Sequence, residues 1–322
     1  MNRKQKALLA ITALTIIVLI VAASALLATT PITNKLQVVA TFYPLAFLSL
    51  EIGGENVQVT QLIPNNTEIH SWEPSASHIS SAEKADIIIY NGAGLDQWME
   101  TEILPALSNT KNRAVVDTTN GLPLLRGEPH EHDEGANETE ETEEHGFYDP
   151  HTWVSPYMAK LQAEKIYTAF IQTDPAHESY YVERWLSLRE RLEQSDGNYT
   201  EGLSTKQKDT IFVSHEAFSY LAYRYGFEQH GVIGLSADEQ PSPTAIANIV
   251  DLMIKHETFV VYVDPVYSEE YAQTLKSELQ TQTGCAVKIL KLYLMLGPID
   301  GKDYFQQQLF NLDNLRLGLI AS

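Results

Sequence analysis

Short apolar segments that alternate with helical patterns are the feature that most constrains this fold. In the first third of the chain we predict strands at residues 36–41, 57–63, 86–90 and 114–116, separated by helices at 44–52, 75–84 and 97–107. The segment Asp-Ile-Ile-Ile-Tyr at 86–90 is almost wholly apolar, which predicts a strand buried on both faces. Such strands connected by helices are typical of parallel sheets in α/β proteins.

The alternation returns in the second half of the chain, after a long helical pattern. Residues 157–171 and 176–196 carry apolar side chains at helical spacing, and the second helix is expected to reach about residue 206. Further strands are predicted at 211–213, 229–233, 259–263 and 287–291, with helices at 216–225, 243–256, 269–282 and 302–317. The sequence therefore predicts an α/β protein of two lobes, each with a parallel sheet flanked by helices, joined by a long rigid helix.

This architecture divides the chain into an N-terminal lobe at residues 34–175, a linking helix at 176–206 and a C-terminal lobe at 207–322. In such proteins a ligand binds in the cleft between the lobes, outside the carboxyl ends of the strands. Candidate functional residues are therefore expected where predicted strands end.

The chain begins with a segment typical of protein export. Arg3, Lys4 and Lys6 precede an uncharged, largely apolar run at residues 7–28. A basic head before an apolar run is typical of a signal peptide, and the run is also long enough to span a bilayer. We therefore assign residues 1–33 to a signal peptide or N-terminal membrane anchor. The rest of the chain is expected outside the cytoplasm, in a periplasm or at the outer face of the cell membrane.

A second unusual segment, residues 128–146, combines acidic residues with histidines and has almost no apolar content. It cannot bury enough surface to offset its ordering entropy, so we expect a mobile loop. Its histidines, His130, His132 and His145, predict weak capture of metal ions. The alternative is a solubilising linker whose histidines have no function.

Charge and cysteine content exclude several classes of function. The chain has 42 acidic and 22 basic residues, for a formal net charge of -20, whereas nucleic-acid binding requires a basic surface. The single cysteine, Cys285, excludes a disulfide framework, a Cys-rich zinc finger and an iron–sulfur cluster. Any metal site in this chain must therefore use His, Asp and Glu.

Three of the ten histidines fall where a strand and a helix are predicted to meet. His70 and His215 each follow a predicted strand, and His151 precedes a predicted helix. Because such junctions face the cleft, the three imidazoles are expected to form a site for a divalent transition metal. Zinc usually takes four ligands, so a further donor or a water should complete the site. Each histidine taken alone is equally compatible with a structural role.

Several short segments occur in a characteristic order between residues 36 and 320. They are VVATFYP at 38–44, the segment 63–79 with His70, ADIIIYNGAG at 85–94, DPHTW at 149–153, SHEAFSYL at 214–221, EQPSP at 239–243 and GKDYF at 301–305. Together they resemble the zinc/manganese solute-binding proteins of ABC importers, the ZnuA- and TroA-like group of periplasmic solute-binding protein family 9. An acidic, His-rich insertion before the Asp-Pro-His motif is a feature of the zinc-handling branch of that family.

The resemblance implies that His70, His151 and His215 bind the metal directly. The third position is His in zinc-type members and tends to be Glu in manganese-type members. His215 therefore favours Zn²⁺ as the bound ion, with Mn²⁺ as the alternative.

The fourth ligand departs from the family pattern. Where the family often carries an acidic residue, this chain has Tyr293, which leaves Glu68 or a water molecule as the preferred replacement. Asp264 matches an acidic position of the family, and we expect it to orient a ligand without binding the ion.

The resemblance implies an extracytoplasmic, high-affinity zinc-binding protein that is not an enzyme. It is expected to act as a monomer and to deliver the ion to an ABC permease with a cytoplasmic ATPase. The alternatives are a manganese receptor of the same type, a surface adhesin or metal buffer on the same fold, and a zinc hydrolase that activates a water. The hydrolase is the weakest of these, because there is no His-Glu-x-x-His helix and Glu216 is not placed like a dedicated general base.

Overall fold

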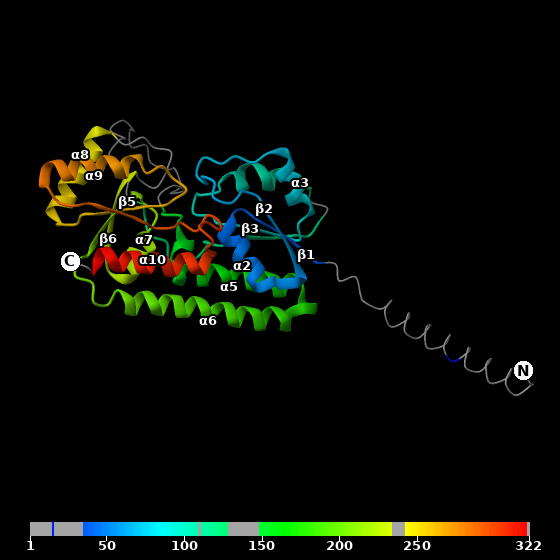
Figure 1. The fold of residues 1–322 in the computed structure, drawn as a ribbon. Coiled ribbons are helices and arrows are strands. Elements are labelled where there is room, and N and C mark those ends of the chain that lie inside the picture. Colours follow the sequence, from blue (N-terminus) through cyan, green and yellow to red (C-terminus); the bar gives the residue numbers. More distant parts are fainter. Residues whose placement is uncertain (1–14, 16–34, 109–110, 128–147, 234–241, 321–322) are drawn as a thin grey trace, which may run out of the picture. The chain divides into compact units, whose positions relative to one another are not determined.

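The computed structural model describes Thr15 and residues 35–108, 111–127, 148–233 and 242–320. Leu36–Ser322 forms one compact unit that contains two sheets (Figure 1). The predicted export segment, apart from Thr15, and the predicted acidic loop at 128–146 lie outside the described residues. None of the helices in the described part of the chain is long and apolar enough to cross a membrane.

The first sheet has four parallel strands in the order β2-β1-β3-β4. Together with its helices it forms the first lobe. Its elements are β1 (Leu36–Ala40), α2 (Tyr43–Gly53), β2 (Val57–Gln61), α3 (Ala76–Lys84), β3 (Ile87–Tyr90), α4 (Leu104–Ala106) and β4 (Ala114–Asp117). Every residue of β3 is buried, as its apolar sequence predicts.

The second sheet repeats this winding with four parallel strands in the order β6-β5-β7-β8. Together with its helices it forms the second lobe. Its elements are β5 (Thr210–His215), α7 (Ser219–Tyr225), β6 (Glu228–Ile233), α8 (Pro243–Lys255), β7 (Val260–Val263), α9 (Glu270–Thr283), β8 (Lys288–Lys291) and α10 (Tyr304–Leu319). In the first sheet β1 lies between β2 and β3, and in the second sheet β5 lies between β6 and β7. The direction of winding therefore reverses beside β1 and beside β5.

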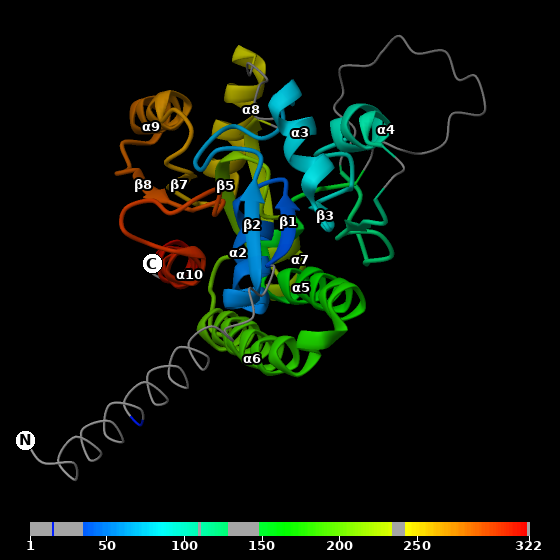
Figure 2. The ribbon, with the colours of Figure 1, turned by 90° about the vertical axis from the view of Figure 1, so that its right-hand side faces the viewer.

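Two long helices, α5 (Pro156–Thr173) and α6 (Glu178–Gly202), connect the sheets. They pack side by side, and α6 also contacts α2 of the first lobe and α10 of the second (Figure 2). The buried face of α6 is formed by Tyr181, Trp185, Leu188, Leu192 and Tyr199. The structure thus confirms two parallel-sheet lobes joined by a long helix, and the exact division at residues 175 and 206 stays a prediction.

Two predicted boundaries differ from the structure. β5 extends to His215, because the ladder with β6 continues to the pair His215 and Ile233, so His215 is the last strand residue and α7 begins only at Ser219. The helix predicted at 97–107 is instead a π-helical turn, Met99–Ile103, followed by the short α4. Pro105 lies in this segment, and proline has no N–H with which to continue an α-helical ladder.

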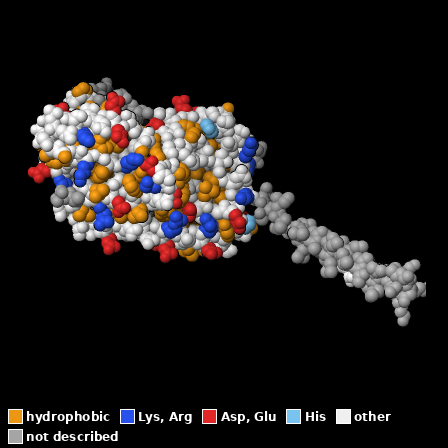
Figure 3. Space-filling model, in the orientation of Figure 1, with side chains coloured by type: hydrophobic (Ala, Val, Ile, Leu, Met, Phe, Trp, Pro, Cys, Tyr) orange, Lys and Arg blue, Asp and Glu red, His pale blue; other side chains and the backbone are white. Residues whose placement is uncertain are grey.

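Basic and acidic side chains are interspersed on the face drawn in Figure 3. Partly exposed ion pairs join Lys111 to Asp86 at 2.9 Å and Lys160 to Glu193 at 3.2 Å. Pairs of this kind contribute little to stability, because solvent screens them.

A buried aspartate, Asp96, holds the turn that follows β3. Its carboxylate accepts hydrogen bonds from the Thr41 hydroxyl at 2.8 Å and from the backbone N–H groups of Asn91 and Gly92 at 2.7 and 2.9 Å. Burial is the main influence on this carboxyl and raises its pKa from 3.8 to about 6, although the hydrogen bonds act in the opposite direction. Asp96 therefore titrates at a higher pH in the folded protein than in the unfolded chain.

Replacing Asp96 with asparagine should change how stability depends on pH. Between about pH 6 and pH 3.8 the folded protein holds a proton on Asp96 that the unfolded chain lacks, so the contribution of Asp96 to stability increases as the pH falls. The free energy of unfolding of the wild type, relative to Asp96→Asn, should rise by about 1 kcal/mol between pH 7 and pH 5. Urea unfolding at both pH values measures this difference, and a constant difference would contradict the raised pKa.

Candidate metal centre

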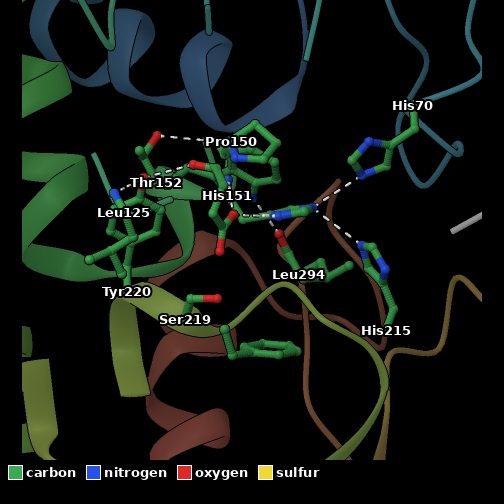
Figure 4. Close-up of polar contacts among 12 residues, drawn as sticks. His70, Leu125, Pro150, His151, Thr152, His215, Ser219, Tyr220 and Leu294 are labelled. Carbon is green, nitrogen blue, oxygen red and sulfur yellow. Dashed lines mark hydrogen bonds and ion pairs between the residues drawn. The ribbon is translucent and has the colours of Figure 1, made fainter. Parts of the chain in front are cut away.

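The three histidines predicted as ligands meet in the structure, with their Nε2 atoms directed toward a common point (Figure 4). His151 Nε2 lies 3.1 Å from His70 Nε2 and 3.2 Å from His215 Nε2. All three ligand atoms lie within 4.8 Å of one another. Within the described part of the chain, no other group of three or more His, Cys, Asp or Glu residues is arranged to hold an ion.

The spacing of these nitrogens suits a tetrahedral zinc ion. Zinc binds imidazole nitrogen at about 2.0–2.1 Å, so two nitrogens at corners of a regular tetrahedron lie about 3.3 Å apart. The separations of 3.1 and 3.2 Å are close to that value. The ligand nitrogens of the third pair, His70 and His215, lie within 4.8 Å of each other. Binding of zinc would bring these two nitrogens to the tetrahedral spacing and leave a fourth position for another ligand.

His70 lies in the loop that follows β2. Glu68 Oε1 accepts a hydrogen bond from the backbone N–H of His70 at 2.8 Å, which fixes the local turn. The same loop is tied to the second lobe, because Asn66 donates from its backbone N–H to the Leu296 carbonyl at 2.9 Å and from Nδ2 to the Pro298 carbonyl at 3.0 Å. Both lobes therefore position the first ligand.

His151 is fully buried and is oriented by Asp149. Asp149 Oδ1 accepts from both the His151 backbone N–H and the ring Nδ1, each at 2.8 Å. A carboxylate on Nδ1 keeps the proton there and leaves the Nε2 lone pair available for a metal, as in the carboxylate–histidine–zinc arrangement. This geometry makes His151 the best-organised of the three ligands.

His215 is the last residue of β5, a central strand of the second sheet. Its side chain is buried, and its ring lies against the Tyr267 ring with 5.6 Å between centroids. A ligand on a central strand is held by the sheet itself, so its position does not depend on loop order. The second lobe thus supplies its ligand from a rigid element.

The electrostatic environment favours neutral imidazole at His70 and a charged carboxylate at Asp149. Burial, and secondarily the neighbouring His151, lower the pKa of His70 from 6.5 to about 3. Burial alone would raise the pKa of Asp149, but the charge and hydrogen bonds of His151, with a contribution from Ser219, hold it below its ordinary value. Neutral imidazole is the form that binds metal, so protons compete weakly for His70.

Glu68 and Asp264 are not part of the three-histidine group. Glu68 Oε2 is buried and has no hydrogen-bond partner among the described residues. Asp264 accepts hydrogen bonds from the backbone N–H groups of Val266, at 2.7 Å, and Leu294. Burial first, and the charge of Glu68 among lesser causes, raise the pKa of Asp264 to about 6. The charge of Glu68, in the first lobe, thus acts on Asp264 in the second.

Tyr293, at the position of the family's expected acid, is directed elsewhere. Its hydroxyl donates to Asp300 Oδ2 at 2.8 Å, and its backbone N–H donates to Asn311 Oδ1 at 2.7 Å. These contacts fix the segment after β8 without presenting an oxygen to the histidines. The predicted capture histidines His130, His132 and His145 lie outside the described residues.

Asp149 is the functional residue that sequence reasoning missed. It stands two residues before His151 in Asp-Pro-His, a spacing at which an aspartate can accept from the backbone N–H of the histidine. The Asp-Pro-His pattern could have indicated the contact of Asp149 with the backbone of His151. The contact of Asp149 with the ring nitrogen depends on the folded geometry.

Replacing Asp149 with asparagine should weaken zinc binding about 10- to 100-fold, the usual effect of removing a carboxylate partner from a ligating histidine. Asparagine keeps the shape but can turn its amide N–H₂ toward Nδ1, which moves the imidazole proton to Nε2. Competition against a chromophoric chelator measures the change. An affinity equal to that of the wild type would contradict the orienting role of Asp149.

Comparisons with known proteins place the chain among zinc-uptake proteins. The High-affinity zinc uptake system protein ZnuA of Bacillus subtilis (strain 168) is 31% identical over 251 residues, which are 78% of this chain and 77% of that protein. The Zinc-binding lipoprotein AdcA of Streptococcus pneumoniae (strain ATCC BAA-255 / R6) is 30% identical over 78% of this chain, and the match spans about half (49%) of AdcA.

A solved structure agrees with these relatives. The Zn(II)-bound ZnuA-like domain of Streptococcus pneumoniae AdcA matches with a TM-score of 0.71 and 27% identity, covering 89% of this chain and 99% of that domain. The model of the family described as "Zinc-uptake complex component A periplasmic" matches residues 38–318. Since that match spans nearly all of the two-lobed unit, the chain belongs to the ZnuA family, zinc-uptake complex component A.

Proposed function

We propose that this protein binds zinc outside the cytoplasm and delivers the ion to an ABC importer. The observation that carries the proposal is the convergence of imidazole nitrogens from both lobes, with His151 Nε2 at 3.1 and 3.2 Å from its two partners. Ligands contributed by two lobes hold an ion when the lobes close and loosen it when they part. That property suits a carrier that must release its ion, and the zinc-uptake names of the relatives support it.

Zinc is the preferred ion because the convergent donors are all nitrogen. Imidazole suits zinc, whereas manganese favours carboxylate, carbonyl and water oxygen. The neutral state of His70, whose pKa is lowered to about 3, removes proton competition at one ligand near neutral pH. A manganese receptor would be expected to place more oxygen ligands at the centre.

We propose Glu68 as the fourth ligand. Its Oε2 atom is buried, lacks a hydrogen-bond partner among the described residues, and belongs to the loop that carries His70. Asp264 would remain outside the coordination shell, because its oxygens hold the backbone N–H groups of Val266 and Leu294.

Replacing Glu68 with glutamine should weaken zinc binding about tenfold or more, because the variant keeps the shape and loses the charge that the ion would bind. The same chelator competition measures it. Unchanged affinity would contradict this assignment and give the fourth position to water.

Location and partners follow from the same proposal. The basic and apolar N-terminal segment would export or anchor the chain, and an ABC permease with a cytoplasmic ATPase would accept the ion from a monomer of this protein. The net charge of -20 attracts cations to the surface.

The zinc hydrolase alternative is disfavoured by the position of Glu216. Its Oε1 accepts a hydrogen bond from the Gly231 backbone N–H at 2.8 Å, so the Glu216 side chain supports β6. A general base must reach the water it activates. Peptidase and esterase assays of the zinc-loaded protein should show no turnover above that of free zinc.

The decisive test of the proposed function is a zinc titration of the full chain in the presence of excess manganese. We expect one tight zinc site that a hundredfold excess of manganese does not displace. Preferential binding of manganese would contradict the assignment of the ion. The absence of any tight site would contradict the proposed function as a whole.

A further inference from the structure

One oxygen of the histidine-orienting aspartate is buried without a hydrogen bond. Asp149 is 1% exposed, and its Oδ1 atom serves His151 through two contacts of 2.8 Å. Its Oδ2 atom has no hydrogen-bond partner among the described residues. A buried carboxylate oxygen without a hydrogen-bond donor costs free energy. A donor within reach should therefore form a hydrogen bond to Oδ2 when the metal binds.

The second lobe presents such a donor at the start of α7. Tyr220 donates its hydroxyl to the Asp149 carbonyl at 2.7 Å and accepts from the Leu125 N–H at 3.2 Å, which ties α7 to the segment that carries His151. The preceding residue, Ser219, lies beside Tyr220 in Figure 4, so the Tyr220–Asp149 contact brings the Ser219 side chain to the same segment.

The Ser219 hydroxyl is oriented by a side chain of β6. Gln229 Nε2 donates to Ser219 Oγ at 2.7 Å, and Gln229 Oε1 accepts from the Phe218 backbone N–H at 2.9 Å. The second contact fixes which end of the amide faces Ser219. A hydroxyl that accepts through one lone pair still has its own hydrogen to donate. That hydrogen is thus available for Asp149.

We propose that Ser219, held by Gln229, donates a hydrogen bond to Asp149 Oδ2 when zinc binds and thereby positions His151 from the opposite lobe. The inference rests on the proposed function, because it concerns how tightly the same centre holds zinc. Ser219 is a positioning residue that acts through Asp149 and does not touch the ion.

This contact would link zinc affinity to closure of the lobes. Asp149 belongs to the segment before α5, whereas Ser219 and Gln229 belong to the second sheet and its helix. When the lobes part, Asp149 loses the Ser219 donor and His151 loses part of its restraint. The ion would then be held less tightly in the open form than in the closed form, which favours release.

The test compares Ser219→Ala in two backgrounds. In the otherwise unchanged full chain, Ser219→Ala should weaken zinc binding about three- to tenfold by chelator competition, less than a substitution of Asp149 itself. In the Asp149→Asn background the same substitution should change affinity less than twofold, because its effect passes through the carboxylate. Equal losses in both backgrounds would overturn the proposal.

Three further variants separate positioning from folding. Ser219→Thr keeps the hydroxyl and should restore affinity to within about twofold of the wild type. Gln229→Met removes the orienting amide and should weaken zinc binding in the same direction, which gives a second test if Ser219→Ala does not fold. Ser155→Ala is the matched control, because Ser155 is also buried near the first turn of a helix but its Oγ has no hydrogen-bond partner among the described residues. The zinc affinity of this variant should equal that of the wild type.

The visible spectrum of the cobalt-loaded protein reports on the geometry of the metal ligands. A residue with a purely structural role would leave that spectrum unchanged. Ser219→Ala should alter the visible d–d spectrum of bound Co²⁺, whereas Ser155→Ala should leave it as in the wild type. If wild-type protein binds zinc tightly and Ser219→Ala matches it in affinity and spectrum, the positioning role is wrong and the proposed function stands. If the wild type itself has no tight site, the proposed function fails first.

Discussion

His151→Ala should weaken zinc binding by roughly several hundredfold. Structural zinc sites with four ligands bind with about 10–16 kcal/mol, so one ligand accounts for about 2.5–4 kcal/mol. Since each 1.4 kcal/mol is a factor of ten, the loss is about 60- to 700-fold. His151 should show the largest loss of the three histidines, because it is fully buried and Asp149 already fixes its ring. Chelator competition on the purified variant measures the affinity.

Two further ligand variants and one control variant show whether a loss of affinity in His151→Ala is specific to the metal centre. His70→Ala and His215→Ala should each lose at least about a hundredfold, since each removes one nitrogen from the same group. His177→Ala is a matched control, because His177 also pairs its Nδ1 with a carboxylate, Asp174, at 2.7 Å but lies outside the metal group. Wild-type affinity in all three site variants would rule out this centre as the zinc site.

Trp153→Ala should destabilise the metal-free protein by about 3–5 kcal/mol, the usual cost of removing a buried tryptophan. Trp153 is completely buried, and its ring meets Phe42 edge-on with 4.7 Å between centroids. Its Nε1 donates to the Leu294 carbonyl of the second lobe at 2.8 Å, so the side chain also joins the lobes two residues from His151. Urea unfolding of the full chain measures the loss.

Trp153→Phe separates packing from the hydrogen bond. Phenylalanine retains most of the ring contact with Phe42 but cannot donate to Leu294, so the loss should be smaller, about 1–3 kcal/mol. A loss below about 1 kcal/mol for Trp153→Ala would show that this interface is not part of the core that holds the centre.

The fold followed from the sequence because its strongest signals are local. Wholly apolar strands such as β3 and the regular spacing of Tyr181, Trp185, Leu188 and Leu192 in α6 are read within one element. The same local reasoning located His70 and His215, which follow predicted strands whose carboxyl ends meet at one edge of a sheet, and His151, which precedes a predicted helix. Whether these three histidines are the zinc ligands stays a prediction until the variants above are measured.

The remaining features depend on contacts between distant segments. Trp153 and Leu294 are 141 residues apart in sequence, and neither residue type signals the other. The extension of β5 to His215 depends on pairing with β6, and the orientation of Tyr293 toward Asp300 depends on the path of the chain after β8. The replacement of the family's acidic residue was visible in the sequence, whereas the burial of Glu68 Oε2 required the folded structure.

The central claim is that imidazole nitrogens from both lobes hold one zinc ion, and anomalous diffraction at the zinc absorption edge from crystals of the loaded protein tests it most directly. The account predicts a single strong anomalous peak about 2.0–2.1 Å from Nε2 of His70, His151 and His215. A peak bound elsewhere, with these three nitrogens turned away from it, would contradict the account.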